Sequence, residues 1–201
     1  MTGFASLDTV PMHSPDQPDF GVELLRLARG SIEYGLAHGE PLPVRSDGMP
    51  DSLADPAATF TTLRLEGRLR GCVGNLEATR PLARDVAHTA FRAAFCDPRF
   101  DPVVDRELSA IRLEVSVLTP LEPLPVSDEA DLLERLEPGT DGLVISLDAR
   151  RATFLPKVWD QLPKPSAFLA ALKKKCGLES DYWSERLEFQ RYRTTAYSDS
   201  A

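Results

Sequence analysis

The spacing of apolar residues divides the chain into helical and extended segments. Apolar residues recur every three to four positions in residues 19–39, 80–96 and 165–177, which predicts three amphipathic helices. Residues 127–139 predict a shorter helix, with Ser127 as its N-terminal cap and a proline and a glycine after its end. The helical part of the fold is therefore expected in four segments.

Between these segments the pattern changes to the short or alternating apolar runs that are typical of β-strands. Two of the runs read as hairpins, one with its turn at Glu66-Gly67. The predicted strands lie in residues 58–75, 111–118, 142–156 and 186–198. Hairpins with helices between them predict an α+β fold, in which helices flank an antiparallel or mixed sheet.

Two segments lack any such period. Residues 1–18 contain three prolines and are interpreted as a flexible leader, and residues 39–56 contain four prolines and are interpreted as a long surface connection. The chain has 201 residues, of which 42% are hydrophobic, so the remainder can bury a full core. We expect one folded region over residues 19–198, built as one domain or as two interlocked subdomains.

Charge and composition narrow the class of protein. The net charge of −8 argues against a dedicated nucleic-acid or anionic-membrane protein, although residues 64–99 carry seven arginines and only four acids. No apolar run is long enough to span a membrane and the start lacks the features of a secretory signal, which favours the cytoplasm.

The cysteines and glycines exclude several further classes of site. Three widely spaced cysteines without a CxxC pair indicate neither a disulfide framework nor a zinc site, so we expect reduced thiols and no metal ligands. The chain contains neither the glycine-rich dinucleotide fingerprint nor the P-loop. No motif in the sequence indicates which cofactor, if any, the protein binds.

The stretch LRGCVGNLE, residues 69–77, carries the strongest candidate chemistry. Cys72 stands between Gly71 and Gly74 and follows Arg70. A displayed thiol near arginines and near the start of the next helix would favour the thiolate, and open glycine amides could bind an anion. The alternative is a tight turn with a small thiol packed beneath it. His88, on the next helix, is a possible general base for a Cys72 nucleophile.

Two other segments offer candidate ligands. In CDPRFDP, the guanidinium of Arg99 could form two parallel hydrogen bonds with a carboxylate or phosphate of a ligand. Alternatively, it could pair with Asp97 while Phe100 packs in the core. Glu114, on the polar face of a strand, either lines a cavity or is solvated.

The segment from residue 152 to residue 175 offers weaker candidates. Phe154 and Trp159 either form the wall of a pocket or pack in the core. The lysines at 173–175 are interpreted as a solvated helix end that complements the helix dipole.

Taken together, these motifs resemble one known family, the AMMECR domain family, whose prokaryotic members are called AmmeMemoRadiSam system protein A. The hallmark hexapeptide of that family stands here as LRGCVG, with Val73 in place of isoleucine. Further blocks follow in the family's order: EATRPLARDV, AAFCDPRFDP, LEVSVL, DGLVI and RATFLPKVWDQLP, with KKKCGLESDYW and YRTTAYS near the end. The resemblance covers about residues 20–198.

The resemblance implies an α+β protein of two subdomains with a cleft near the hexapeptide, and it brings no established reaction. It implies a Memo-like protein and a radical S-adenosylmethionine protein as partners. The residues that it marks are Arg70, Gly71, Cys72, Gly74, Asp97, Arg99 and Phe100. We therefore expect an enzyme or enzyme subunit that binds a small anionic or peptide-like ligand beside Cys72. A non-catalytic adaptor is the alternative, and a nucleic-acid-associated regulator is a weaker one.

Overall fold

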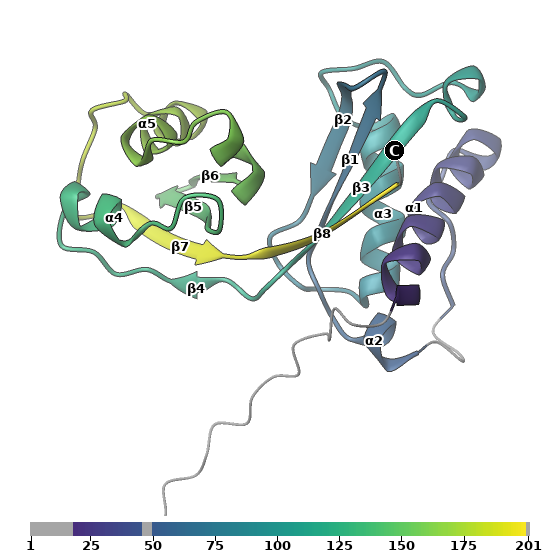
Figure 1. The fold of residues 1–201 in the computed structure, drawn as a ribbon, viewed down its shortest axis with the longest axis horizontal. Coiled ribbons are helices and arrows are strands. Elements are labelled where there is room, and N and C mark those ends of the chain that lie inside the picture. Colours follow the sequence, from purple (N-terminus) through teal and green to yellow (C-terminus); the bar gives the residue numbers. More distant parts are fainter. Residues whose placement is uncertain (1–17, 46–49, 200–201) are drawn as a thin grey trace, which may run out of the picture.

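The computed structural model describes residues 18–45 and 50–199, which form two lobes placed side by side (Figure 1). The larger lobe contains the first three helices and the smaller lobe the last two. The predicted leader, residues 1–18, lies outside the described residues except for Pro18, which already belongs to the first helix. The interpretation of the leader as flexible stays a prediction.

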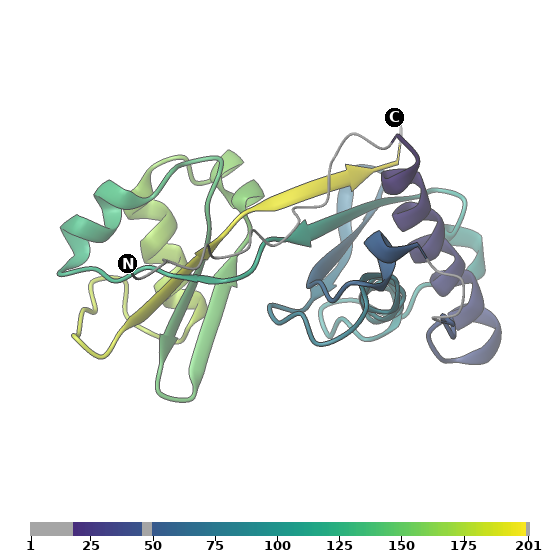
Figure 2. The same ribbon diagram turned by 90° about the horizontal axis from the view of Figure 1, so that it is seen from below.

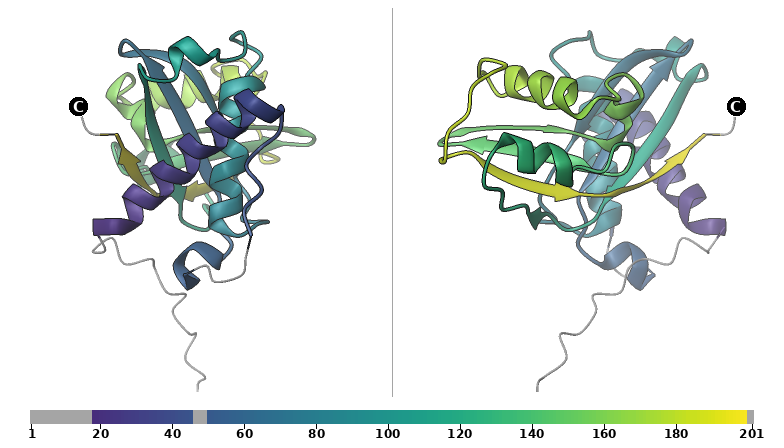
Figure 3. Two further views of the ribbon diagram at one scale, coloured as in Figure 1. Left: turned by 90° about the vertical axis from the view of Figure 1, so that its right-hand side faces the viewer. Right: turned by 60° about the vertical axis from the view of Figure 1, so that its left-hand side comes forward.

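The large lobe is built on a four-stranded antiparallel sheet with the order β2-β1-β3-β8. Its strands are β1 (Thr59–Leu65), β2 (Arg68–Gly74), β3 (Ile111–Leu118) and β8 (Thr194–Ser198). Helices α1 (Pro18–His38) and α3 (Leu82–Phe95) lie on one side of this sheet (Figure 3, left), and α2 (Asp51–Ala54) is a single short turn. Among residues 18–45 and 50–199, no helix of the same lobe covers the other face of the sheet.

The small lobe repeats the plan with a second antiparallel sheet, in the order β4-β7-β5-β6. Its strands are β4 (Glu122–Pro123), β5 (Gly142–Leu147), β6 (Arg150–Phe154) and β7 (Glu188–Tyr192). Helices α4 (Glu129–Arg135) and α5 (Pro165–Lys175) pack on one face of this sheet (Figure 3, right). Two short 3₁₀ helices, Asp105–Glu107 and Pro156–Asp160, follow α3 and β6.

Each lobe buries its own apolar core. The large-lobe core joins α1 and α3 to the sheet, and the small-lobe core joins α4 and α5 to β5 and β6. On β5 the residues Leu143, Ile145 and Leu147 enter the small-lobe core, whereas Val144 points to the opposite face. Val144 contributes there to a small apolar cluster with residues of both lobes, which explains the three consecutive apolar residues from Leu143 to Ile145.

The chain passes between the lobes twice, and the two passages run together (Figure 2). One passage leads from β3 to β4 and the other from β7 to β8. The amide of Thr119 donates to the carbonyl of Arg193 at 2.9 Å, and the amide of Arg193 donates to the hydroxyl of Thr119 at 2.9 Å. The single strand predicted over residues 186–198 is thus two strands of two sheets, interrupted at Arg193.

The predicted α+β fold with an antiparallel sheet flanked by helices is confirmed, and the differences are local. Asp128, not Ser127, caps α4, because its carboxylate accepts a hydrogen bond from the amide of Asp131. The sequence did not indicate α2, in the segment interpreted as a connection, or the two-residue β4. The lysines at 173–175 are not a uniformly solvated helix end: the side chain of Lys173 is fully buried and pairs with Glu129 at 2.7 Å.

Candidate functional site

The hexapeptide from Leu69 to Gly74 is an extended edge strand of the large sheet, not a turn. Its pairing with β1 slips by one residue, so Arg70 forms a bulge. The hairpin turn comes earlier, at Glu66 and Gly67, which have φ angles of 51° and 77°. The alternative of a tight turn with a thiol packed beneath it is therefore wrong.

Gly71 is required by close packing against α3. A Cβ at this position would lie 2.1 Å from the carbonyl oxygen of Ala93, in the last turn of that helix. The backbone amide of the next residue, Cys72, donates a hydrogen bond to the carboxylate of Asp97, which follows the same helix. The expectation that the start of this helix lies near the thiol is wrong, because the C-terminal end, where the helix dipole is negative, lies beside it.

Gly74 ends β2 directly beneath an aromatic ring. A Cβ at this position would lie 2.2 Å from the ring of Phe60. Neither Gly74 nor Gly71 has a positive φ angle. Both positions therefore need glycine because it has no side chain, not because of its backbone freedom.

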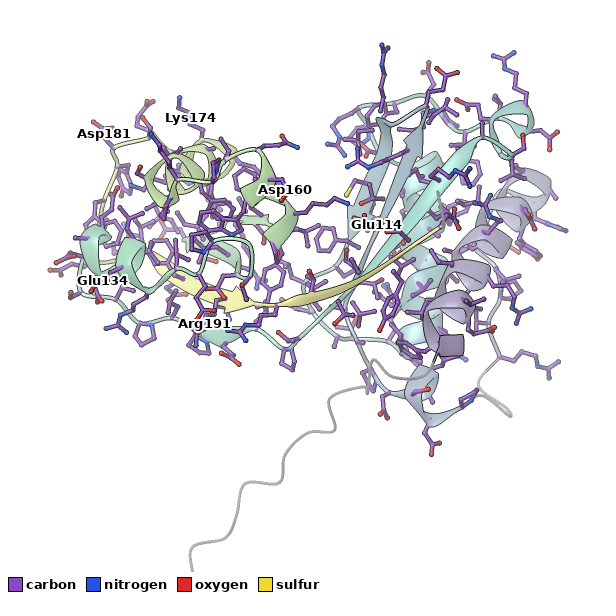
Figure 4. All side chains as sticks on the ribbon, viewed as in Figure 1. Glu114, Glu134, Asp160, Lys174, Asp181 and Arg191 are labelled. Carbon is purple, nitrogen blue, oxygen red and sulfur yellow. The ribbon has the colours of Figure 1, made fainter. Side chains whose placement is uncertain are left out.

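Strand pairing shows which side chains share the helix-free face of the large sheet. Cys72 lies opposite Thr62, which in turn lies opposite Glu114 on β3. The hydroxyl of Thr62 donates to Sγ of Cys72 at 3.3 Å, and the thiol is half-buried. Phe60 and Gly74 share this face, since Phe60 stands two residues before Thr62 and Gly74 stands two residues after Cys72. The face looks toward the small lobe, as the labelled Glu114 shows in Figure 4.

His88 lies on the other side of the sheet, on α3. The α3 side of β1 is marked by Thr61, whose hydroxyl is 2.9 Å from that of Thr89. Burial, followed by the charges of two nearby arginines, lowers the pKa of His88, and its Nδ1 is buried without a hydrogen-bond partner in the described part of the chain. With the sheet between them, His88 and Cys72 do not form the dyad that the sequence suggested.

Asp97 holds the hexapeptide to the loop after α3. Its carboxylate accepts hydrogen bonds from the amide of Cys72 at 2.9 Å and from the guanidinium of Arg99 at 2.9 and 2.6 Å. The Arg99 guanidinium, against the effect of burial, lowers the pKa of Asp97 to about 2. Arg99 also donates to the carbonyl of Cys72 at 3.3 Å and lies over the ring of Phe100 at 5.4 Å. The ion pair of the alternative interpretation is therefore present, whereas Phe100, expected in the core, is only half-buried.

Arg70 is engaged by the protein itself. Its guanidinium forms a bidentate ion pair with Glu107, with hydrogen bonds of 2.8 and 2.9 Å, and donates to the carbonyls of Asp101 and Pro102. The side chain is 15% exposed. Four hydrogen bonds leave little capacity for a ligand, so we regard Arg70 as a residue that fixes the edge strand.

Glu114 bridges the lobes. Its carboxylate forms an ion pair with Lys157 of the small lobe and accepts a hydrogen bond from the hydroxyl of Ser198 at 3.3 Å. A second ion pair, between Glu77 and Arg151 at 2.8 Å, also joins the two lobes. The helix-free faces of the two sheets are thus held toward each other by opposite charges.

A groove of about 510 Å³ lies between these faces. The segment from Gly74 to Thr79 forms its wall on the large lobe. The wall on the small lobe includes Arg151, Thr153 and Lys175. Of the predicted site residues, only Gly74 lines the groove directly, while Cys72 stands two residues before it on the same face.

A buried carboxylate positions the large-lobe wall of the groove. Asp85, on α3, is fully buried and accepts hydrogen bonds from Asn75 at 2.7 Å and from Arg80 at 3.2 Å, on either side of the wall segment. It also accepts from the amide and the hydroxyl of Thr59. Asp85 does not stand out in the sequence, because an aspartate in the first turn of a helix is common and is usually explained by helix capping.

Phe154 and Trp159 belong mainly to the core. Trp159 is 3% exposed, stacks on Phe168 with ring centroids 3.8 Å apart and donates to the carbonyl of Asp141. Phe154 packs against the same Phe168 ring. The alternative of core packing is therefore correct for both.

Two further findings concern metals and membranes. Among residues 18–45 and 50–199, no group of three or more His, Cys, Asp and Glu side chains is arranged to hold a metal ion. No helix in this described part is long and apolar enough to cross a membrane.

Fold and site together define a two-lobed α+β protein with an edge-strand cysteine beside a groove between its lobes. A family model described as AMMECR1 matches residues 25–197, and the chain belongs to this family. The resemblance drawn from the hexapeptide and its companion blocks is thereby confirmed.

Known relatives extend over nearly the whole chain. A protein of Methanothermobacter thermautotrophicus is 38% identical over 174 residues, which are 84% of this chain and 88% of the relative. A protein of Thermofilum pendens is 36% identical over 178 residues, 81% of each chain. The crystal structure of the uncharacterized protein PH0010 from Pyrococcus horikoshii is similar with a TM-score of 0.85 and 30% identity, over 92% of this chain and 93% of that one. These names state no activity, so the function must be argued from the site.

Proposed function

We propose that the groove between the lobes binds a small anionic ligand, and that the protein acts on this ligand as an enzyme or enzyme subunit. The observation that carries the proposal is the placement of Arg151 and Lys175, from the small lobe, opposite the segment Gly74–Thr79 across the groove. Concave sites with an apolar floor and a few convergent polar groups are the usual places of small-molecule binding.

The chemistry of the groove favours a small acid with an apolar body. Phe60 and Leu76 line it and belong to the apolar cluster at the junction of the lobes, whereas Arg151 and Lys175 bring positive charge. Glu77 already balances Arg151, which leaves Lys175 as the cation most open to an anion.

A peptide that adds a strand to the sheet is less favoured. At Cys72, the outward backbone groups of the edge strand are occupied by Asp97 and Arg99. Strand addition needs these groups to be free. A compact acid is therefore the better ligand class.

Cys72 is the candidate nucleophile. Its thiol is half-buried on the face that looks toward the small lobe, and Arg99 and Lys175 lie close enough to interact with its charge. The hydroxyl of Thr62 fixes the direction of the sulfur.

The alternative function is that of a non-catalytic adaptor. Leu69 and Val104 are unusually exposed for large apolar residues, at 39% and 42%, and they flank the ion pair between Arg70 and Glu107. Exposed apolar residues on an edge strand can serve protein contact. As partners for either function we propose the Memo-like and radical S-adenosylmethionine proteins, and this part of the proposal is supported by the family resemblance alone.

Thermal unfolding in the presence of small acids tests the proposal. We expect short-chain carboxylates or phosphate esters to raise the melting temperature of the full chain in a saturable way. Thr79→Trp should abolish this shift, because Thr79 is an exposed residue on the groove wall. Thr140→Trp, at an exposed position that does not line the groove, should preserve it. Equal shifts in both variants would contradict the proposed site.

A further inference from the structure

Arg99 has hydrogen-bonding capacity to spare beside Cys72. Its Nε and Nη2 are used by Asp97 and by the carbonyl of Cys72, but its Nη1 has no hydrogen-bond partner among the described residues. The side chain is 55% exposed. Because Asp97 and the ring of Phe100 fix the guanidinium, the free edge is presented in one orientation.

Lys175 is the corresponding cation of the small lobe. It is the last residue of α5, its Nζ donates to the carbonyl of Thr153 at 2.9 Å, and the ammonium lies 5.1 Å from the centre of the Phe154 ring. An ammonium has three donors, so two are left for a ligand. Partial burial in the groove lowers the pKa of Lys175; the negative charge of a Cys72 thiolate acts in the opposite direction, and Arg99 lowers it further.

These two cations come from opposite lobes, and each is close enough to Cys72 to interact with it electrostatically. Arg99 is tied to the backbone of Cys72, at 3.3 Å from its carbonyl oxygen. Lys175 lines the groove together with Phe60 and Gly74, which share the face of Cys72 in the large sheet. Two cations near one thiol, one from each lobe, are an arrangement that recognises an anionic group and places the adjoining part of the ligand at the sulfur.

We propose that the acid group of the ligand binds between Arg99 and Lys175, next to the Cys72 thiol, and that its apolar body lies along Phe60 in the groove. The inference rests on the proposed function and narrows it to a carboxylate or phosphate monoester with an apolar tail. Because each lobe supplies one cation, the subsite is complete only when the two lobes are held in the arrangement described above.

The charge dependence of alkylation tests this subsite in the full-length protein. The same thiolate attacks the methylene carbon of iodoacetate and of iodoacetamide and displaces iodide from both. Only iodoacetate carries a negative charge, so the ratio of the two rates reports the local potential. The rate at each cysteine is read by peptide mass spectrometry. Exposed Cys96 serves as the internal reference, and buried Cys176 is expected to be protected.

We expect Lys175→Met to lower the iodoacetate-to-iodoacetamide ratio at Cys72 by roughly fivefold, as for removal of one unit charge at short range in a partly shielded groove. Lys174→Met is the matched control, since Lys174 is exposed and points outward from the small lobe in Figure 4. Arg99→Met should also lower the ratio, with Arg99→Lys restoring part of it. The ratio at Cys96 should stay constant in Lys175→Met and Lys174→Met.

Protection of Cys72 by added acids distinguishes failure of the proposed subsite from failure of the proposed function. Hexanoate and hexyl phosphate should slow the reaction of Cys72 with iodoacetamide, whereas neutral hexanamide should not, and Lys175→Met should remove the protection. An unchanged ratio and unchanged protection in Lys175→Met would overturn the subsite while leaving the groove as a binding site. Loss of the charge effect with no protection by any acid would instead contradict the proposed function.

Discussion

The backbone amide of Cys72 donates a hydrogen bond of 2.9 Å to Oδ2 of Asp97. Arg99, which the same carboxylate holds, donates in return to the carbonyl of Cys72 at 3.3 Å. These two bonds take the place of a neighbouring strand at the edge of the large sheet. Cys72 and Asp97 are 25 residues apart along the chain. Their hydrogen bond joins the hexapeptide and the segment after α3 into one structural unit that fixes the thiol.

Replacing the carboxylate should weaken this unit. Asp97→Asn keeps the size of the side chain but loses the charge that four N–H donors share, and the side chain is only 3% exposed. We expect the free energy of unfolding at neutral pH to fall by about 2–3 kcal/mol. Urea unfolding measures this, with exposed Asp181→Asn as the control that should stay within about 0.5 kcal/mol of the wild type.

The same carboxylate should make stability depend on acid. The Arg99 hydrogen bonds hold the pKa of Asp97 at about 2 in the folded protein, below its ordinary 3.8. A lowered folded pKa stabilises the protein above the ordinary value, and this contribution disappears as the pH falls toward the folded value. We expect the wild type to lose its advantage over Asp97→Asn, roughly 2 kcal/mol, between pH 4 and pH 2. A difference between the two proteins that is the same at pH 6 and at pH 2 would contradict this assignment.

Gly71 should tolerate no side chain. In Gly71→Ala the new methyl group would lie 2.1 Å from a backbone oxygen that cannot move without distorting α3, so we expect a loss of roughly 3 kcal/mol. Gly30→Ala is the opposite case. Gly30 lies inside α1, the nearest atom to an added Cβ is 3.7 Å away, and alanine favours helix, so stability should rise by about 0.5–1 kcal/mol. Chemical denaturation of both variants checks the pair of predictions.

Lys173 should depend on its counter-ion. Its side chain is fully buried, pairs with Glu129 at 2.7 Å and lies 5.7 Å from the centre of the Trp183 ring. Glu129→Gln removes the charge that balances the ammonium, and we expect a loss of about 1–3 kcal/mol. Glu134→Gln, exposed on the same helix (Figure 4), should change stability by less than about 0.5 kcal/mol. Equal unfolding curves for the two variants would show that the buried pair contributes nothing.

The sequence predicts the elements well because their patterns are local. The hairpin turn at Glu66-Gly67 depends on neighbouring residues and is present. The alternation of β3 holds from Ile111 to Val115 and fails at Ser116, which is buried. The break at Arg193 was missed because the alternating pattern continues through it while the chain changes sheets. Lys173 was predicted to be solvated because of its charge. Its position in the helix indicates the opposite: it stands four residues after buried Leu169 and next to buried Leu172, so it points into the small lobe.

The candidate site was predicted only in part, because its geometry depends on contacts between distant segments. The sequence singled out Cys72, Asp97 and Arg99, and the structure brings these three together. It gave no sign of Lys175, which reaches the site only because the two lobes face each other across the groove. Arg70, prominent in the motif, is bound by Glu107 instead, a partner 37 residues away.

The central claim is that the groove between the lobes binds a small acid. Its most direct test is a titration of the isotopically labelled full-length protein with hexanoate, followed by the backbone amide resonances of Gly74, Asn75, Thr79 and Ala152, which line the groove. We predict saturable shifts concentrated at these residues, with no such shifts on addition of hexanamide. Absence of saturation at these amides, or equal shifts with the neutral amide, would contradict the claim.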